Sequence, residues 1–498
     1  MNGQPTSPHA IVIGTGFGGL AAAVRLSARG FRVTVLEQRE RPGGRAYVLK
    51  KDGYTFDIGP TVVTAPHLFE ELFTLSGKNM ADFVDMRKVE PFYAVRFHDG
   101  TAFDYTGDSE AMLAQIRDLT PDDVEGYRAF MKLSEKIFHV GFEALSEVPF
   151  DSLWSMVRIA PTMVKLKSYK TVYGLISSYI KNEKLRQLLS FHTLLVGGNP
   201  FNTTSVYALI AYLEEKWGVH FAMGGMGALV SALADLAASN GVQFRYSTEV
   251  KKIVVENGRA VGVQLSSGET LASDIVVSNA DAGWTFKHLL EPDVRRRWTD
   301  KKVDKLQYSM SLFVWYFGTN KRYDDVKHHS ILLGPRYKGL LDDIFHKKVL
   351  AEDFSLYLHR PTATDPSLAP EGHDAFYVLS PVPHLEAGID WETRAEPYRA
   401  SIQAYLEQTV LPGLGEHLDV SYMMTPKHFE SDLLSLHGAA FAMQPTLTQS
   451  AYFRPHNKNE DVDGLYLVGA GTHPGAGLPG VLCSAAIMDK LVTDAVRI

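Results

Sequence analysis

Two short apolar runs near the start of the chain flank a segment with helical spacing. Residues 10–13 and 31–36 are the β-type runs, and apolar positions recur from Leu20 to Leu26 after a glycine-rich turn. The order strand, turn, helix, strand within about 30 residues has the size of one βαβ unit, whose crossover is right-handed. This pattern predicts that a parallel sheet begins here.

The pattern changes again further along the chain. From about residue 91 to residue 220, helix-like stretches are rich in aromatic and basic residues and hold few glycine clusters. Glycine turns return at 224–227 and precede a helical pattern, a strand near 242–246 and a hairpin at Asn257-Gly258. After a mixed stretch, about 284–436, the chain closes with a strand, a glycine turn and a helix. The sheet domain is therefore predicted to be discontinuous.

The predicted fold class is α/β, with a Rossmann-like domain and a discontinuous inserted α+β domain. The Rossmann-like domain is assigned to residues 1–90, 221–283 and 437–498. The inserted domain, expected to hold the substrate and to contact a membrane, is assigned to residues 91–220 and 284–436.

Composition limits the partners and the cellular location that we expect for the protein. The 498 residues are 45% apolar and 21% charged, and 50 basic against 57 acidic residues give a net charge of −7, which indicates no nucleic-acid partner. The single cysteine, Cys483, excludes an internal disulfide and a cysteine-based metal site, so we predict no metal and a cytoplasmic protein. Residues 1–10 are polar and lack a secretory signal, and no apolar run reaches about 18 residues, so any membrane contact is expected to be peripheral.

A dinucleotide site is predicted at the first strand–helix turn. Gly14, Gly16 and Gly19 form G-x-G-x-x-G in the context where two glycines let the backbone approach a pyrophosphate and the third lets helix and strand pack. Glu37 follows Gly19 by 18 residues at the end of the second strand, where a carboxylate accepts hydrogen bonds from ribose hydroxyls. The same charge would repel a 2′-phosphate, which disfavours NADP.

Two further glycine-rich segments favour FAD over NAD. Gly43 and Gly44 precede Arg45, whose planar donor fork suits a second approach to the same diphosphate. Near the other end, the strand from Leu465 leads into glycines before a helix that begins near Val481. A helix N-terminus there could stabilise negative charge at the far end of a long cofactor. We therefore predict a Rossmann-like FAD-binding domain.

The chain resembles the bacterial phytoene desaturases, members of the carotenoid/retinoid oxidoreductase family within the amine-oxidase-like flavoprotein superfamily. The resemblance spans nearly the whole chain, and its last two segments resemble carotenoid desaturases specifically. It is carried by IGTGFGGL (13–20), LEQR (36–39), PGGR (42–45), FDIGPT (56–61), FHTLLVGGNP (191–200) and GAGTHPGAG (469–477).

The resemblance implies roles for named residues. It places Glu37 at the adenosine ribose, Gly14, Gly16, Gly19 and Arg45 around the diphosphate, and the backbone of Val250 at the adenine. The full set of cofactor-binding residues that it implies is Gly14, Gly16, Phe17, Gly18, Gly19, Glu37, Gln38, Gly43, Gly44, Arg45, Val250, Gly471, Pro479, Gly480 and Val481.

The implied substrate is phytoene or a related apolar polyene, oxidised to a more conjugated carotene of the neurosporene or lycopene type. Hydride transfer to the flavin and proton loss from the neighbouring carbon would make each double bond, with oxygen or a quinone as the electron acceptor. Such a substrate needs a long apolar channel. Candidate lining residues are Phe150, Trp154, Tyr169, Tyr173, Tyr179, Phe191, Tyr207, Tyr212, Trp217, Phe313, Trp315 and Tyr316.

A local basic stretch indicates how the substrate arrives. Residues 150–190 hold seven basic and two acidic side chains, interleaved with apolar residues such as Trp154 and Met163. This composition suits docking on an anionic membrane, here the inner face of the cell membrane, although a solvated helix face would show the same pattern.

Catalytic residues other than the cofactor are harder to assign. Arg158 is the candidate polar group near the channel, because the corresponding family segment carries an arginine, but Ser155 stands where some relatives have an aspartate. His192, His220 and His473 are interpreted as structural. Alternative functions are a carotenoid 3,4-desaturase, an isomerase, a ketolase or a diapophytoene desaturase, and, in other classes, an amine oxidase or a carotenoid-binding protein.

Overall fold

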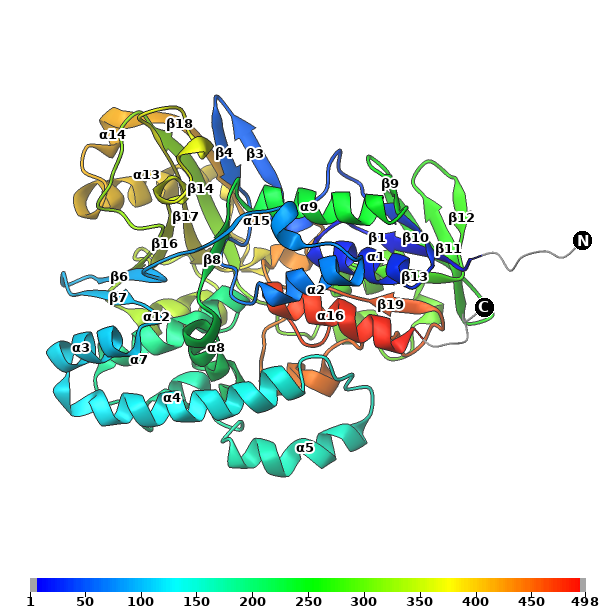
Figure 1. The fold of residues 1–498 in the computed structure, drawn as a ribbon, viewed down its shortest axis with the longest axis horizontal. Helices are drawn as coiled ribbons and strands as arrows, with labels where there is room; N and C mark the ends of the chain where they lie inside the picture. Colours follow the sequence, from blue (N-terminus) through cyan, green and yellow to red (C-terminus); the bar gives the residue numbers. More distant parts are fainter. Residues whose placement is uncertain (1–6, 493–498) are drawn as a thin grey trace, which may run out of the picture.

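A five-stranded parallel sheet forms the first layer of the computed structural model, which describes residues 7–492 (Figure 1). Its strands are β1 (His9–Ile13), β2 (Arg32–Leu36), β9 (Gln243–Arg245), β13 (Ile275–Ser278) and β19 (Leu465–Leu467). The order is β19-β13-β1-β2-β9, with every neighbouring pair parallel. β1 is apolar almost throughout because it is an internal strand covered on both faces. The predicted parallel sheet is confirmed, while residues 1–6 of the predicted polar N-terminus lie outside the described residues.

Three helices pack beside this sheet and join distant parts of the chain. They are α1 (Phe17–Ala28), α9 (Met226–Ser239) and α16 (Leu478–Leu491). α1 packs against both α9 and α16, so the first and last helices lie side by side in Figure 1. Their buried side chains and one face of the sheet form a shared apolar core. The sheet layer is therefore closed by a segment from the far end of the chain.

A seven-stranded mixed sheet forms a second layer, in the order β18-β14-β17-β16-β15-β6-β7. Its strands are β6 (Tyr93–Phe97), β7 (Ala102–Tyr105), β14 (Ser311–Thr319), β15 (His329–Leu333), β16 (Leu356–His359), β17 (Asp374–Val382) and β18 (Leu418–Met424). β15 and β6 pair in parallel, and the other neighbours are antiparallel. β6 and β7 correct the helix-like interpretation of the segment after residue 91, because their pairing depends on a strand far along the chain.

Alternate residues of β14 face opposite sides of this sheet, as the period of a strand requires. Phe313 packs against Trp391 of α13 (Trp391–Thr409), with ring centroids 5.9 Å apart. Leu312, Val314 and Tyr316 face the other way and line a central cavity. One strand thus supplies both a core and a cavity wall.

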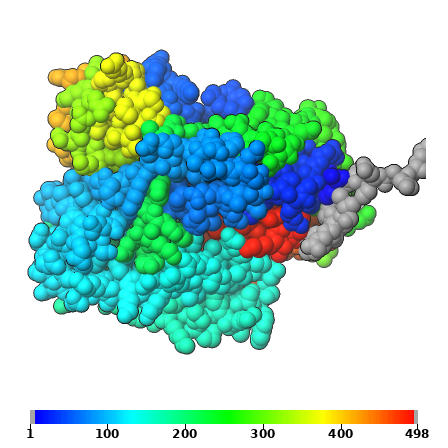
Figure 2. All heavy atoms as spheres, in the orientation of Figure 1, coloured from blue at the N-terminus to red at the C-terminus, as the bar shows by residue number. Residues whose placement is uncertain are grey.

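A group of helices follows β7 along the chain, and two of them, α5 (Leu153–Lys165) and α8 (Leu209–Trp217), line the cavity. The others are α3 (Ser109–Leu119), α4 (Val124–Phe138), α6 (Val172–Ile176) and α7 (Glu183–Ser190). α4 packs on α8, whereas α5 lies outermost, beyond α4 (Figure 1). The segment around α5 forms the lower rim of the molecule in Figure 2. Across residues 7–492, no helix has the length and apolar character needed to cross a bilayer.

Smaller elements complete the two layers. They include β3 (Val48–Lys51), β4 (Tyr54–Asp57), α2 (His67–Leu75), β5 (Met86–Lys88), β8 (His220–Ala222), β10 (Val250–Glu256), β11 (Arg259–Leu265), β12 (Thr270–Ala272), α12 (Tyr337–Asp342) and α15 (Pro426–Ser431). The β10–β11 hairpin turns at Asn257-Gly258, as predicted. We propose the predicted domain boundaries as the division between the parallel-sheet unit and the mixed-sheet unit.

Candidate cofactor and substrate cavity

One continuous cavity of about 780 Å³ runs from the parallel sheet to α5. Its first part is lined by the turns that follow β1, β2, β13 and β19, at the carboxyl ends of the strands. Ligands of open parallel sheets bind at this edge. Its second part is lined by β14, β17, α8 and α5, with mostly apolar side chains. We call these parts the cofactor end and the substrate end.

The β1–α1 turn brings backbone atoms to the cavity. Gly14 has φ +89°, and a Cβ atom added at Gly16 would lie 2.8 Å from Nδ2 of Asn279. Gly14, Gly16, Phe17 and Gly18 line the cofactor end. A Cβ atom at Gly19 would lie 2.0 Å from the Gly14 carbonyl oxygen. Gly19 therefore does not line the cavity and instead lets the helix pack on the turn, as the motif predicts.

Glu37 is buried at the end of β2, with its carboxylate fixed by three donors. Oε2 accepts hydrogen bonds from the Thr15 backbone at 2.9 Å and the Thr15 hydroxyl at 2.5 Å, and Oε1 accepts one from the Arg39 backbone at 3.0 Å. Glu37, Gln38 and Val250 line the same part of the cavity. The structure thus brings together Glu37 and Val250, the two residues predicted for the adenosine portion, with Gln38 beside them.

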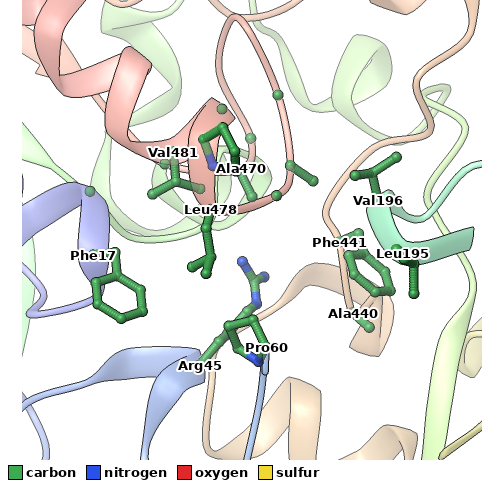
Figure 3. Close-up of a pocket in the computed structure, with 18 of the residues that line it drawn as sticks. Phe17, Arg45, Pro60, Leu195, Val196, Ala440, Phe441, Ala470, Leu478 and Val481 are labelled. Atoms are coloured by element: carbon green, nitrogen blue, oxygen red, sulfur yellow. The ribbon is translucent and has the colours of Figure 1, made fainter. Parts of the chain in front are cut away.

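Arg45 extends into the middle of the cavity, between Leu478 and Pro60 (Figure 3). Its Nη2 atom donates to the Ser435 hydroxyl at 2.5 Å and lies 3.7 Å from Oδ2 of Asp281. Burial lowers the pKa of Arg45, and the Asp281 carboxylate opposes this shift. Nε is buried and has no hydrogen-bond partner among the described residues. A guanidinium with a spare donor fits an anionic group such as a diphosphate.

The turn before α16 closes the cofactor end. Gly471, Pro479, Gly480 and Val481 line the cavity, and a Cβ atom at Gly480 would lie 2.6 Å from the Gly475 carbonyl oxygen. The first turn of α16 therefore faces the cavity, with the positive end of a 14-residue helix dipole directed at its contents. Such an end stabilises negative charge on a bound cofactor.

Site residues that follow β13 or lie later in the chain were not predicted from the sequence. Asn279 and Asp281 follow β13 directly, and the Asn279 side chain packs against the glycine turn after β1. Ser435 reaches Arg45 from a loop 390 residues later in the chain. The apolar run of β13 was the signal that could have identified Asn279 and Asp281. Residues that follow a strand of the parallel sheet lie at the carboxyl edge of that sheet, where the cofactor end is.

At the substrate end, some predicted aromatic residues line the cavity and others do not. Those that line it are Phe150, Tyr169, Phe191, Tyr207 and Tyr316. Those outside the lining are Trp154, Tyr173, Tyr179, Tyr212, Trp217, Phe313 and Trp315. Trp154 is 73% exposed on α5, whereas Phe313 and Trp315 belong to the core around α13.

Arg158 also lies outside the cavity. It is exposed on α5, while the neighbouring Met156, Ile159 and Met163 face the cavity. The prediction that Arg158 lies near the channel is therefore wrong, because helical spacing places its side chain on the outer face of α5. Its placement supports a surface contact rather than catalysis.

Three buried histidines form a cluster that the sequence analysis, which predicted no metal, did not recognise. His328, His329 and His359 each offer a nitrogen within 4.8 Å of the others. Burial lowers the pKa of all three, that of His328 to about 3, so the rings are neutral. Nδ1 of His328 contacts the Thr364 hydroxyl and Nδ1 of His329 contacts the Tyr357 hydroxyl, each at 2.6 Å. The cluster therefore fixes the hydroxyl of Tyr357, which lines the cavity.

Comparison with known proteins places this cavity in a family. Residues 17–487 match the model of the flavin containing amine oxidoreductases. The chain is 49% identical to the neurosporene-forming phytoene desaturase of Cereibacter sphaeroides, over 98% of this chain and 95% of that protein. It is 48% identical to the lycopene-forming phytoene desaturase of Pantoea ananas, over 97% of this chain and 98% of that protein. The chain belongs to the phytoene desaturase family of flavin-containing oxidoreductases.

Solved structures of low sequence identity share this fold. An oxidoreductase from Methanosarcina mazei superposes with a TM-score of 0.64 at 18% identity, covering 97% of this chain and 100% of that chain. The cyclohexylamine oxidase of Brevibacterium oxydans superposes with a TM-score of 0.61 at 16% identity, covering 98% of both chains. The predicted α/β fold class is thus confirmed.

The residues present fit FAD, in agreement with the match to the flavin containing amine oxidoreductases. The glycine turn after β1, the Glu37 carboxylate and the spare Arg45 donor occupy one end of the cavity, and the first turn of α16 occupies the other side of the same end. These groups match a ribose, a diphosphate and a ring that gains negative charge on reduction. We propose that fourteen of the fifteen predicted residues, which line the cavity, bind FAD, and that Gly19 supports the turn after β1.

Proposed function

We propose that the protein is an FAD-dependent phytoene desaturase of carotenoid biosynthesis, which converts phytoene into a more conjugated carotene of the neurosporene or lycopene type. The observation that carries the proposal is that one continuous cavity runs from the cofactor end to α5 and is apolar at its substrate end. Relatives at 46–49% identity are named phytoene desaturases that form neurosporene or lycopene. An elongated apolar cavity suits a hydrocarbon that offers no charged group for binding.

The protein's own residues bind the polyene, orient it and exclude water from it. When bound, the flavin supplies a hydride acceptor. Leu195, Val196, Phe441 and Leu478 surround the space in front of Arg45 (Figure 3), so a substrate there meets apolar side chains on several sides. Water exclusion strengthens each electrostatic interaction in this space. Oxygen or a quinone would then take the electrons from the reduced enzyme.

We further propose that α5 docks on an anionic membrane and admits substrate from it. Every residue of α5 is at least partly exposed, and Leu153, Trp154 and Val157, which lie outside the cavity lining, are each more than half exposed. The opposite side of α5 faces the cavity. Basic residues flank the exposed apolar side chains, namely Arg158, Lys165, Lys167 and Lys170. A helix with one face in the lipid interface and the other on the cavity would give an apolar molecule a path that avoids water.

The test is to incubate the FAD-loaded protein with phytoene in liposomes and to identify the products by chromatography and mass. We expect loss of two hydrogens per step and absorption moving to longer wavelength, together with bleaching of the flavin when oxygen is absent. A carotenoid isomerase or ketolase would leave phytoene unchanged, and this result would refute the proposal. Incubation with diapophytoene in parallel separates the activity on the shorter substrate.

A further inference from the structure

Glu214 and His192 form a buried polar pair in the wall of the substrate end. Glu214 lies on α8, and His192 lies on the 3-10 segment η5 (Phe191–Val196). Their side chains are 1% and 3% exposed, and Oε2 of Glu214 lies 3.0 Å from Nε2 of His192. Both residues line the cavity. A carboxylate in an otherwise apolar wall is costly to bury and calls for an explanation.

The carboxylate of Glu214 is only partly satisfied. Oε1 accepts a hydrogen bond of 2.8 Å from the Tyr93 hydroxyl. Oε2 has no aligned hydrogen-bond donor among the described residues, despite its proximity to His192. Burial and the charge of Glu214 raise the pKa of Tyr93, which keeps this hydroxyl protonated as a donor. One oxygen is therefore fixed by Tyr93, and the other retains the capacity to accept a proton.

Glu214 differs from the other carboxylates that line the cavity, which belong to the cofactor end. Glu37 is held by backbone and hydroxyl donors after β2, and Asp281 faces Arg45. Glu249 precedes Val250 in the same part of the cavity, and Asp432 follows α15 beside Gln38. Among the residues that the structure describes, Glu214 is thus the carboxylate placed in the wall of the substrate end, beside cavity-lining Leu213 and Ile210.

We propose that Glu214 is the base that removes the proton in each desaturation, positioned by Tyr93 and His192. This inference rests on the proposed function. One C–H bond of the substrate breaks with its electron pair, which leaves as a hydride to the oxidised flavin. The C–H bond on the neighbouring carbon gives its proton to Oε2 of Glu214, and its electrons form the new double bond. The proton leaves Glu214 before the next step, and the electrons leave with the terminal acceptor.

The physical reason for a carboxylate is the charge that hydride loss creates. A carbon that loses a hydride becomes positive, and a nearby buried anion stabilises it strongly because water does not screen the interaction. Tyr93 and His192 act through Glu214 and are positioning residues. The interpretation of His192 as purely structural is revised accordingly.

The kinetic test uses FAD-loaded wild type, Glu214→Gln and Glu215→Gln, mixed without oxygen with phytoene in liposomes. Glutamine keeps the size and the hydrogen bond from Tyr93 but accepts no proton. We expect flavin bleaching to slow by about 100-fold or more in Glu214→Gln, the range of general-base catalysis. Glu215→Gln is the matched control on the same helix, since Glu215 does not line the cavity, and it should stay within about twofold of wild type.

The outcomes separate the two proposals. If wild type neither bleaches nor forms product, the proposed function is wrong. If wild type bleaches and Glu214→Gln bleaches at a similar rate, the role of Glu214 is wrong while the function stands. FAD content and circular dichroism report whether each variant is folded.

A second measurement uses wild type and does not depend on the folding of any variant. Infrared difference spectra of wild type after one anaerobic turnover should show the band of a newly protonated carboxyl group. Its absence would contradict the proposal. Where Glu214→Gln folds, the band should be missing, and in Tyr93→Phe it should be shifted because one hydrogen bond to the carboxyl group is gone.

Discussion

The cofactor end and the substrate end of the cavity are built in different ways. At the cofactor end, the turns that follow four parallel strands form the surface, and the glycines after β1 and before α16 leave no room for a Cβ atom, as at Gly16 and Gly480. At the substrate end, side chains from a mixed sheet and several helices form the surface, and one helix, α5, is exposed along its whole length. A surface of backbone atoms fits one ligand shape, whereas a wall of side chains tolerates amino-acid substitutions. Substitutions at the cofactor end should therefore abolish FAD binding, and substitutions at the substrate end should only weaken the interactions of that end.

The largest effect is expected from Gly19→Ala. Its Cβ atom would lie 2.0 Å from the Gly14 carbonyl oxygen, which belongs to the backbone and cannot rotate away. The helix must shift from the turn, so we expect a protein that is purified without bound FAD or does not fold. The ratio of flavin to protein absorbance measures this. Gly339→Ala is the control, because its Cβ atom would meet only the Arg336 side chain at 3.3 Å. Normal FAD content in Gly19→Ala would contradict the comparison.

A smaller effect, confined to the substrate end, is expected from Trp154→Asp combined with Val157→Asp. These side chains are 73% and 57% exposed on α5. Transfer of two large apolar side chains into lipid contributes about 3 kcal/mol, so removing them should weaken binding to anionic liposomes by tenfold or more. Co-sedimentation measures the binding, and FAD content should not change. Val349→Asp, at another exposed apolar residue, is the control. Unchanged liposome binding would remove the membrane proposal, as would unchanged binding after neutralising the basic residues around α5.

The smallest effect concerns acid stability of the cofactor end. Burial lowers the pKa of His473 from 6.5 to about 3, so the ring is neutral in the folded protein. Below pH 6.5 the unfolded chain binds a proton that the folded one does not, so stability present above pH 6.5 is lost as the pH falls toward 3. At pH 5 the loss is roughly 2 kcal/mol.

His473→Gln should therefore move the release of FAD on acidification to lower pH, followed by the fluorescence of the free flavin. His98→Gln, at an exposed position, should leave the midpoint where it is in wild type. An identical midpoint in His473→Gln would show that this histidine does not limit the acid stability of the cofactor end.

The comparison also explains which parts could be predicted from the sequence. Gly14, Gly16, Gly19 and Glu37 were predictable because the strand–turn–helix that presents them is local, and its backbone conformation demands glycine at fixed spacing. Their placement follows that expectation. FAD rather than another dinucleotide followed from Arg45 and the glycines near the end of the chain, with the family resemblance in support.

The substrate end was less accessible to prediction. Glu214 meets His192 and Tyr93 only through tertiary packing, and nothing in the sequence around any of them indicates the others. Aromatic residues of core and cavity look alike in sequence, since both are apolar and large. The β14 alternation, with Tyr316 on one side and Trp315 on the other, was the one local pattern that could have sorted some of them.

The placement of β19 and α16 bears on how the protein is made. β19 completes the parallel sheet beside β13, and α16 packs against α1, although both partners come much later in the chain. During synthesis, β13 and α1 expose apolar edges until β19 and α16 have been made. Such edges are where nascent chains aggregate. Because residues 479–481 at the start of α16 line the cofactor end, that end of the cavity is complete only after α16 has been made.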